Sequence, residues 1–449
     1  MRLAEHRYHN LSEIRGPLLF LDSVCSARMG ETVIIISPDG SKREGEVLLI
    51  DGETVMIQIY GESRGLSLEK TEVIFSDSIR KAPVSEELLG RICNGSGILI
   101  DNQPPVIPQR YDPIIGAPLN PAARARPHEF IETGFSSVDV LNTLVRGQKL
   151  PIFSSAGLPS QDLVAGLLRN ARMPSAITSE EQRFSVVFVA LGLTHHEYAF
   201  YMQVLQALET PCTSYINLAS DPVLERLLAP RFALTFAEYL AFEFDYDVLV
   251  IIADMTNYCD ALREVATARE ELPGRRGYPG YMYSDLASIY ERAGCIKGKR
   301  GSITQLPVLT MPENDITHPV PDLTGYITEG QLVLSAELHR RGIFPPVDVL
   351  PSLSRLMQQG IGSGQTSKDH QPIANNLYRY YAKGCDLRNL EAIVGRDGLS
   401  RQDQSFLDYA EAFETRFVHQ GEGQRRTIRE SLNIGSTLDK VLAPEQESP

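Results

Sequence analysis

Residues 149–163 have the spacing that most resembles a chemical site in this sequence. They read as a short apolar stretch, a loop of small residues and a helical start, Lys149-Leu-Pro-Ile-Phe-Ser-Ser-Ala-Gly-Leu-Pro-Ser-Gln-Asp-Leu163. A phosphate-binding loop, G-x-x-x-x-G-K-[ST], has this outline: its backbone N–H groups wrap phosphates, its lysine reaches the terminal phosphates and its hydroxyl holds Mg²⁺. On that pattern, Ser154 replaces the first glycine, Pro159 the second, Ser160 the lysine and Gln161 the hydroxyl residue.

These replacements remove what phosphoryl transfer needs. Pro159 has no N–H donor and fixes φ at about −65°, and Ser160 cannot supply a fixed positive charge. We therefore expect no phosphoryl transfer here. Weak nucleotide binding, or none, is expected from the six candidate residues of the loop, which are Ser154, Ser155, Gly157, Pro159, Ser160 and Gln161. The alternative is an ordinary strand-turn-helix without a ligand.

A candidate acid, Asp254, comes just after the aliphatic stretch Val248–Ile252. In ATPases with a phosphate-binding loop, an acid at such a strand end orients Mg²⁺ and water. Without the loop lysine this acid has little to orient, and an aspartate before Met255 and Thr256 is equally typical of a helix N-cap. The residues alone leave both interpretations open.

The segment Gly274-Arg-Arg-Gly-Tyr-Pro-Gly-Tyr-Met-Tyr283 combines glycines, arginines and tyrosines. Catalysis is not expected there, but flexible glycines beside exposed aromatic side chains suit a loop that contacts another protein. The candidate contact residues are Arg275, Arg276, Tyr278 and Tyr281. The alternative is a plain surface turn.

Arg355 closes the segment Leu350-Pro-Ser-Leu-Ser-Arg355, where a sheet region is expected to meet a helical region. A guanidinium offered across an interface can stabilise charge on a transferring phosphoryl group, because it stays charged and binds oxygens bidentately. A single arginine is more commonly a surface or salt-bridged residue. The histidines, including the pair His195 and His196, have no metal-binding spacing, so we expect no metal site.

The elements that would position these residues fall into three regions. Up to about residue 76, short β-rich runs separated by Pro38-Asp-Gly40 and Asp51-Gly52 predict a small antiparallel barrel or sandwich. From about 130 to 345, apolar strands alternate with helical stretches, which indicates a buried, mainly parallel sheet. The predicted strands are 151–153, 185–190, 214–217, 248–252 and 306–309.

Beyond about residue 350 the pattern becomes helical. Thr366 and Asp369 predict a capped helix start, and Gly384 is a plausible end of that helix. Ser400 and Asp403 repeat the capping signal, before an apolar stripe formed by Phe406, Ala410, Phe413 and Phe417. These aromatic residues are expected in a core.

Composition limits the function further. The 449 residues include 43 basic and 57 acidic side chains, a net charge of −14, which argues against a general nucleic-acid or anionic-membrane surface. The six cysteines are scattered without a C-x-x-C pair, so neither a zinc site nor a disulfide framework is expected, and a reducing cytosol fits best. No apolar run approaches the ~20 residues of a membrane span, so any membrane role is expected to be peripheral.

Taken together, these stretches resemble the B subunits of V-type (also called A-type) rotary ATPases, the regulatory partners of the catalytic A subunits. The resemblance covers nearly the whole chain. It is carried by Ile14–Leu18, Pro118–Pro121, Phe130–Gly134, Leu144–Phe153, Asp254–Cys259, Pro273–Tyr283, Pro321–Gly330 and Pro351–Arg355.

The resemblance implies an α/β multidomain fold: an N-terminal β-barrel over 1–76, a central nucleotide-binding-type (RecA-like) domain over 77–349 and a C-terminal helical bundle over 350–449. It implies that Leu193 occupies the position where catalytic relatives carry the water-polarising glutamate, in Gly192-Leu-Thr-His-His-Glu197. It also implies that Arg355 is an arginine finger acting in the ATP site of the catalytic subunit, and that Gly274–Tyr283 faces the rotor shaft.

The implied assembly is an alternating ring of three A and three B subunits, with central rotor and peripheral stalk subunits. ATP or ADP would lie at the shared A/B interface, with Mg²⁺ held by the A subunit. The location implied is the cytoplasmic face of a membrane, with the membrane contacted only indirectly.

Two enzyme alternatives remain. One is a self-sufficient hexameric motor of the same superfamily, a secretion-system ATPase or a termination helicase; the other is a catalytic rotary subunit. Ser160 and Leu193 argue against both, and the net charge argues against a nucleic-acid channel.

Overall fold

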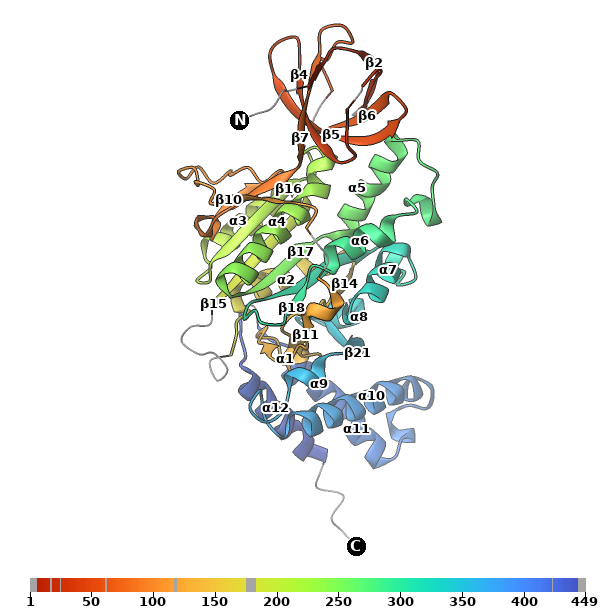
Figure 1. The fold of residues 1–449 in the computed structure, drawn as a ribbon. Coiled ribbons are helices and arrows are strands. Elements are labelled where there is room, and N and C mark those ends of the chain that lie inside the picture. Colours follow the sequence, from red (N-terminus) through yellow and green to blue (C-terminus); the bar gives the residue numbers. More distant parts are fainter. Residues whose placement is uncertain are drawn as a thin grey trace.

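The computed structural model describes residues 6–16, 18–24, 26–60, 63–116, 119–174, 183–421 and 423–442. Figure 1 shows a β-barrel at one end, a helical domain at the other and an α/β domain between them. The predicted fold class, an N-terminal barrel, a mainly parallel central sheet and a helical C-terminus, is confirmed.

The N-terminal barrel is antiparallel throughout, with strand order β1-β7-β4-β5-β6-β3-β2. Buried side chains alternate with partly exposed ones along β4, as a half-buried strand requires. At the predicted hairpin between β5 and β6, Asp51 pairs with Thr54 and Gly52 takes φ +61°. The strands are β1 (His6–Tyr8), β2 (Leu11–Arg15), β3 (Leu18–Leu21), β4 (Glu31–Ile36), β5 (Lys42–Asp51), β6 (Thr54–Tyr60) and β7 (Glu72–Ile79).

The central sheet has the order β21-β20-β14-β19-β17-β15-β16-β9. All neighbours along this path are parallel except β20 and β21. Its strands are β9 (Ile92–Asn94), β14 (Ile152–Ser155), β15 (Arg183–Leu193), β16 (Cys212–Leu218), β17 (Tyr246–Ala253), β19 (Ser302–Met311), β20 (Gly330–Leu334) and β21 (Val347–Ser354).

Short antiparallel pairs surround the central sheet. They are β8 (Lys81–Val84) with β10 (Arg110–Pro113), β12 (Phe130–Ile131) with β13 (Leu144–Val145), and β11 (Arg124–Ala125) with β18 (Gly294–Ile296).

Helices cover both faces of the central sheet, which explains why its strands are apolar throughout. Along β15, Val186 and Phe188 belong to the core cluster that includes α2 residues, whereas Val187 and Val189 belong to the cluster that includes α4 residues. The helices are α1 (Ser136–Asp139), α2 (Ser160–Asn170), α3 (His195–Gln206), α4 (Val223–Phe244), α5 (Met255–Ala268), α6 (Met282–Tyr290), α7 (Pro319–Ile327) and α8 (Ala336–Arg340).

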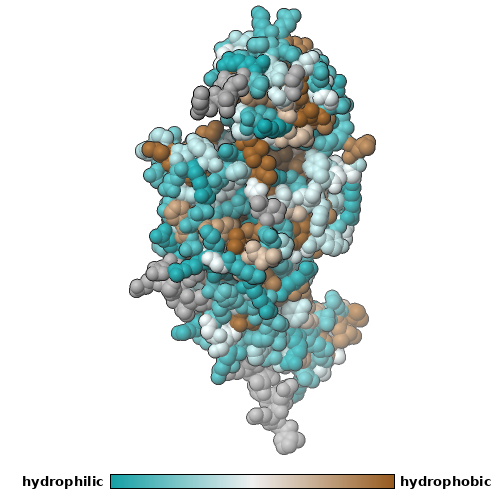
Figure 2. All heavy atoms as spheres, in the orientation of Figure 1, coloured by the Kyte–Doolittle hydropathy of each residue, from teal (hydrophilic) through white to brown (hydrophobic). Residues whose placement is uncertain are grey.

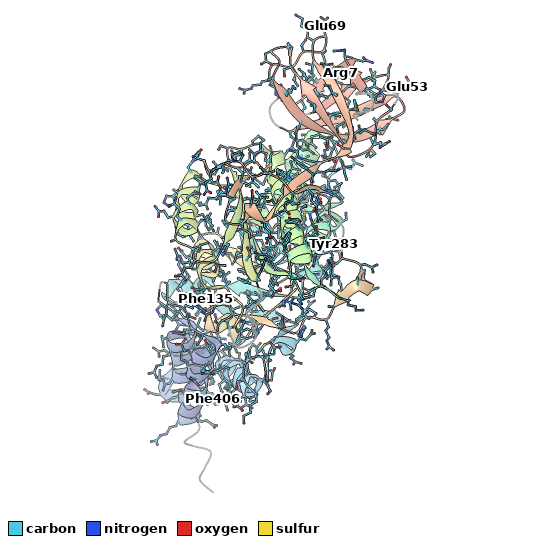
Figure 3. The ribbon with its side chains drawn as sticks, turned by 60° about the vertical axis from the view of Figure 1, so that its left-hand side comes forward. Arg7, Glu53, Glu69, Phe135, Tyr283 and Phe406 are labelled. Carbon is cyan, nitrogen blue, oxygen red and sulfur yellow. The ribbon has the colours of Figure 1, made fainter. Side chains whose placement is uncertain are left out.

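The C-terminal helices are α9 (Met357–Gly360), α10 (His370–Val394), α11 (Arg401–Ala412), which continues as a π-helical turn over Phe413–Val418, and α12 (Ile428–Leu442). The predicted cap of α11 is confirmed, since the Ser400 hydroxyl accepts a hydrogen bond from the Asp403 N–H at 3.1 Å. Figure 3 labels Phe406, from the predicted stripe, within this domain.

Two helix-boundary predictions are wrong. Gly384 does not end a helix but lies inside α10, which ends at Val394 and is followed by the C-cap Gly395 at φ +73°. A Cβ on Gly384 would lie 2.6 Å from the Ala410 Cβ, so this glycine allows α10 and α11 to approach closely. Asp369 does precede α10 but makes no capping bond, and the Thr366 hydroxyl accepts from the Gly362 N–H instead.

Over the described ranges, five cysteines are free and no cluster of ligands could hold a metal ion; Cys25 lies outside these ranges. Within the described helices, none combines the length and the apolar character needed to cross a membrane. Figure 2 shows a largely hydrophilic surface on the face drawn, interrupted by hydrophobic patches.

Candidate functional site

The strand-loop-helix unit predicted from sequence is formed by β14, the loop 156–159 and α2. In the sheet, β14 lies between β19 and β20, so the loop emerges at the carboxyl ends of parallel strands. This edge is where open α/β sheets bind ligands. Gly157 takes φ +82°, a conformation that favours glycine.

The hydrogen bonds of the loop differ from those of a phosphate cradle. The Leu158 N–H donates to the Ser155 carbonyl at 3.1 Å, and the Ser160 N–H donates to the Leu158 carbonyl at 2.8 Å. Pro159 has no N–H, and α2 begins without a side-chain cap. Ser154 is buried, and the Ser155 hydroxyl bonds the Asn314 side chain. Backbone donors that would wrap a phosphate are therefore partly missing and partly used within the loop.

Lys149, the lysine nearest to the loop in the sequence, does not replace the missing loop lysine. It comes just before β14 and is 3% exposed, and its Nζ pairs with Glu291 and Glu329, each at 2.9 Å. These two carboxylates neutralise its charge. The loop therefore lacks the cation that stabilises a transferring phosphoryl group.

A cavity of about 320 Å³ is lined both by the start of α2 and by the strand-end acid. Ser160 and Gln161 line it from the start of α2, and Asp254 lines it from the end of β17. The remaining lining comes mainly from β15, α3, α5 and β19: Val164, Leu191, Gly192, Leu193, Glu197, Tyr201, Ala253, Thr256, Asn257, Val308 and Thr310. Of the six candidate loop residues, Ser160 and Gln161 line this cavity, whereas Ser154, Ser155, Gly157 and Pro159 do not.

Asp254 caps α5 and also faces this cavity. Its Oδ1 accepts from the Thr256 N–H at 2.7 Å and from the Thr310 N–H at 3.2 Å, and its Oδ2 accepts from the Thr310 hydroxyl at 2.5 Å. Burial raises the pKa of Asp254, although these bonds act in the opposite direction. The helix-cap interpretation is therefore confirmed, and the role of this acid in orienting Mg²⁺ and water stays a prediction.

Leu193 is 7% exposed and presents no acid to the cavity. The carboxylate found nearby is Glu197, which sequence reasoning did not select. Its Oε2 accepts from the N–H and the hydroxyl of Thr194, both at 2.8 Å, in a capping box that starts α3. The Thr-x-x-Glu spacing was the available signal, but it indicates a helix start rather than a base.

A second cavity of about 50 Å³ adjoins α2 and was also missed. Phe135, Phe200 and Phe344 line it together with Gly166 and Arg169 of α2. Figure 3 labels Phe135 near the boundary with the helical domain. Segments distant in sequence meet here, so no local pattern could indicate it.

The predicted contact segment, Gly274–Tyr283, is anchored by its arginines. Arg275 pairs with Asp322 at 2.9 Å, and Arg276 pairs with Asp315 at 3.0 Å. Tyr281 is 37% exposed, but Tyr278 is 3% exposed, so the expectation of an exposed ring is wrong for Tyr278.

The buried Tyr278 ring is held from several sides. Its hydroxyl donates to Asp260 at 2.9 Å, and the guanidinium of Arg263 stacks 4.9 Å from its ring centroid. The exposed aromatic side chains of the segment are Tyr281 and Tyr283, the latter labelled in Figure 3.

Arg355 follows β21 at the edge of the central sheet. Its N–H donates to the Glu329 carbonyl at 3.0 Å, and its side chain is exposed. Among the described residues its guanidinium has no hydrogen bond or ion pair. Arg355 thus lies apart from the residues that line the 320 Å³ cavity.

A parallel sheet with a strand-loop-helix unit, set between a barrel and a helical domain, defines a three-domain protein of the nucleotide-binding type. Residues 134–354 match the nucleotide-binding domain of the ATP synthase alpha/beta family, and residues 11–77 match the beta-barrel domain of that family. Residues 359–448 match the C-terminal domain of V and A type ATP synthase.

Full-length relatives agree with these matches. A V-type ATP synthase beta chain of Geotalea uraniireducens is 61% identical over 445 residues, covering 99% of this chain and 100% of that protein. One of Thermus thermophilus is 51% identical over 447 residues, covering 98% and 93%. The chain belongs to the family of V-type ATP synthase beta chains within the ATP synthase alpha/beta family.

A solved structure of an ATP synthase subunit, NeqB from Nanoarcheaum equitans, superposes with a TM-score of 0.73. It is 38% identical in sequence and covers 95% of this chain and 98% of its own. The three-domain architecture described above is therefore shared with an experimental structure.

Proposed function

We propose that this chain is the non-catalytic, regulatory subunit in the soluble ring of a V-type rotary ATPase. It would couple ATP synthesis or hydrolysis to H⁺ or Na⁺ transport across a membrane. The observation that carries this proposal is the loop before α2, where Pro159 and Ser160 replace the residues that hold phosphates and two N–H groups are bonded within the loop. The domains proposed are 1–76, 77–349 and 350–449.

The nucleotide sites of such a ring would lie between subunits. We propose that ATP or ADP binds at the interface with a catalytic A subunit, which holds the Mg²⁺. On this chain the 320 Å³ cavity offers the hydroxyl of Ser160, the amide of Gln161 and the carboxyl of Asp254. Without a cation in the loop, phosphate binding there is expected to be weak.

Arg355 is the proposed catalytic contribution, as an arginine finger in the neighbouring catalytic site. Its guanidinium is exposed at the end of β21 and not engaged by acids of the described residues. A free guanidinium can be offered to another chain without first breaking an ion pair. This supports a role across an interface.

The remaining contacts follow from the ring. We propose that the Gly274–Tyr283 segment contacts the central rotor, with Tyr281 and Tyr283 as its exposed aromatic side chains and Arg275 and Arg276 holding its shape. Peripheral stalk subunits would connect the ring to the membrane sector. The chain would then lie at the cytoplasmic face of the membrane and contact it only indirectly.

The test is ATP hydrolysis by this chain and the catalytic A subunit, each alone and mixed, with native mass spectrometry of the mixture. We expect no turnover by this chain alone and turnover in a ring of three A and three B subunits. Turnover by this chain alone, abolished in Asp254→Ala, would contradict the non-catalytic role.

A further inference from the structure

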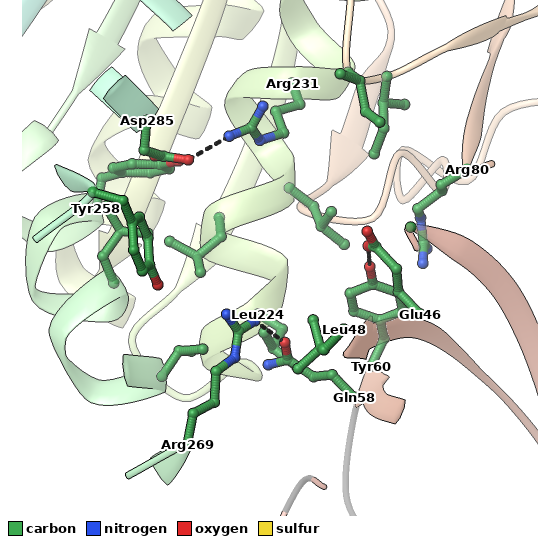
Figure 4. A pocket seen from close by; sticks show the side chains of 18 residues that line it. Glu46, Leu48, Gln58, Tyr60, Arg80, Leu224, Arg231, Tyr258, Arg269 and Asp285 are labelled. Carbon is green, nitrogen blue, oxygen red and sulfur yellow. Dashed lines mark hydrogen bonds and ion pairs between the residues drawn. The ribbon is translucent and has the colours of Figure 1, made fainter. Parts of the chain in front are cut away.

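A separate cavity of about 280 Å³ lies where the N-terminal barrel meets the central domain (Figure 4). The barrel contributes residues of β5 and β6, and the central domain contributes residues of α4, α5 and α6. None of its lining residues also lines the 320 Å³ cavity. This junction cavity is therefore a different site from the one beside α2.

The junction cavity contains buried donors without a protein acceptor. Gln58 is 2% exposed; its Oε1 accepts from Arg269, but its Nε2 has no hydrogen-bond partner among the described residues. The Nη1 of Arg80 and the Nε of Arg269 are also buried and have no hydrogen-bond partner among the described residues. The Arg80 guanidinium lies 4.3 Å from the Tyr60 ring centroid, apart from the other two groups (Figure 4). Because buried donors are rarely left unpaired, the neighbouring donors of Gln58 and Arg269 point to a ligand with acceptor oxygens.

The carboxylates of the cavity are already engaged. The Tyr60 hydroxyl donates to Glu46. Asp285 accepts from the Arg231 guanidinium and from the Tyr258 hydroxyl, each at 2.6 Å. These acids therefore do not compete strongly for the unpartnered donors of Gln58.

The lining residues themselves include more guanidiniums than carboxylates. Three guanidiniums, from Arg80, Arg231 and Arg269, face two carboxylates, which leaves one positive charge among the lining residues. Arg80 and Arg269 also reach acids outside the lining, Glu44 at 2.9 Å and Glu271 at 3.4 Å. The side chains of these acids are 56% and 32% exposed, so solvent weakens both pairs.

The rest of the wall is apolar. It includes Leu48, Ile114, Leu224, Leu228, Leu262 and Val265. Ile115 and Tyr281, also in the lining, are 51% and 37% exposed, so the cavity opens to solvent beside them. Its volume is close to the lower end of the range for small-molecule pockets, roughly 300–1,000 Å³. Both the size and the wall suit a compact apolar body.

We propose that the junction cavity binds a small organic carboxylate, with its oxygens toward Gln58 and Arg269 and its apolar body against the leucines of α4 and β5. The site goes beyond the role in a rotary ring and does not depend on it. Since the walls come from two domains, an occupied cavity would hold the barrel and the central domain together.

The test uses benzoate as the probe and benzamide as its neutral counterpart, titrated into the full chain and followed by ligand-observed NMR. We expect benzoate to bind at least tenfold more tightly than benzamide. Gln58→Leu and Arg269→Met should each weaken benzoate binding at least tenfold. The matched control is Arg183→Met, because Arg183 pairs with Glu86 at 3.2 Å outside this cavity.

A filling variant separates loss of binding from loss of folding. Leu224→Phe keeps the donors of Gln58 and Arg269 but reduces the volume, so it should abolish benzoate binding while the thermal unfolding midpoint stays unchanged. Equal affinity for benzoate and benzamide, no binding by the natural chain, or undiminished binding by Gln58→Leu would overturn the proposal. None of these results bears on the ATPase experiment.

Discussion

At the scale of single residues, Arg355 differs from the other arginines selected from the sequence. Arg275 and Arg276 are bonded to aspartates of the same chain, whereas the Arg355 guanidinium has no such partner among the described residues. A guanidinium already bound to a carboxylate would lose that bond before it could reach a phosphate. Arg355 can act across an interface without this cost.

Arg355→Ala should therefore lower ATP hydrolysis by an assembled ring about 10³-fold or more, equivalent to about 4 kcal/mol of transition-state stabilisation. Arg355→Lys should restore little of it, because an ammonium group lacks the bidentate fork. The measurement is kcat of the purified ring, with ring assembly checked by native mass spectrometry.

Arg340→Ala serves as the control, since Arg340 is also exposed and its side chain, within the described part of the chain, bonds only the Ala336 carbonyl of its own helix, at 3.4 Å. Its kcat should match that of the unmodified ring. Near-normal turnover by an intact Arg355→Ala ring would remove the finger assignment.

Residue identity could be read from the sequence, but residue surroundings could not. The residue types of Pro159 and Ser160 were enough to predict that the loop cannot support phosphoryl transfer. The burial of Tyr278 depends on Asp260, Arg263 and His318, which pack around it from other segments. For the same reason the sequence did not single out Gln58. Its Nε2 lies at the contact between the barrel and the central domain, and that contact forms only in the folded chain.

At the scale of elements, the apolar strands of the central sheet were predictable because helices cover both of its faces. The ends of the helices were harder to predict from the sequence. Gly384 resembles a terminator in sequence, yet the neighbouring helix α11 decides its role, with the Phe406 carbonyl and the Ala410 Cβ each 2.6 Å from where a Cβ would be. At Gly384, packing against α11 therefore outweighs the tendency of glycine to end a helix.

Glu414 shows how the C-terminal helices are held together. It lies in the turn that continues α11 and is fully buried. It accepts from Arg388 of α10 at 2.6 and 2.9 Å, from Tyr381 at 3.0 Å, and from Arg341. Burial alone would raise the pKa of Glu414, but the two guanidiniums lower it below its ordinary value of 4.5.

A carboxylate with a lowered folded-state pKa stabilises the fold above its unfolded pKa and loses this contribution as pH falls through the folded value. The chain should therefore lose stability below about pH 4.5, and Glu414→Gln should flatten this dependence. At pH 7, Glu414→Gln should cost about 3 kcal/mol, because two partly exposed guanidiniums lose the charge of a fully buried carboxylate. Thermal unfolding followed by circular dichroism between pH 3.5 and 7 provides the measurement.

The control for this experiment is Asp408→Asn, which removes an exposed acid of α11 paired with Arg396 in the connection between α10 and α11. Its stability should stay within about 0.5 kcal/mol of the unmodified chain at pH 7. If Glu414→Gln kept the full acid dependence of the natural chain, Glu414 would not be the group responsible.

At the scale of the whole molecule, the order of barrel, sheet and helical domain could be predicted, because each has its own hydrophobic period. The connections between them could not. The link between the central and C-terminal domains depends on residues far apart in sequence, such as Glu132 and Ile428, which are separated by 296 positions. No local pattern records such a pairing.

Glu132 is the centre of this link. It is 3% exposed, and its carboxylate accepts from Arg172 at 2.7 Å, from Arg425 at 3.2 Å and from the N–H of Ile428, the first residue of α12, at 2.8 Å. Beside it, the Arg426 N–H donates to the Gly134 carbonyl at 3.1 Å. One buried carboxylate thus joins the start of α12 to the central domain.

Glu132→Gln keeps the size of this side chain but removes the charge shared by Arg172 and Arg425. Both arginines are partly exposed, at 41% and 30%, so the cost should be that of hydrogen bonds to a charged group, about 1.5–3 kcal/mol. Because the bonds lie at the domain boundary, the loss should appear as local opening of α12, with its amide hydrogen exchange accelerated roughly ten- to hundredfold. Arg396→Met, which breaks an exposed pair within the helical domain, should leave these amides unchanged. Equal acceleration throughout the chain would instead mean that the domains open as one unit and that Glu132 does not act as a local link.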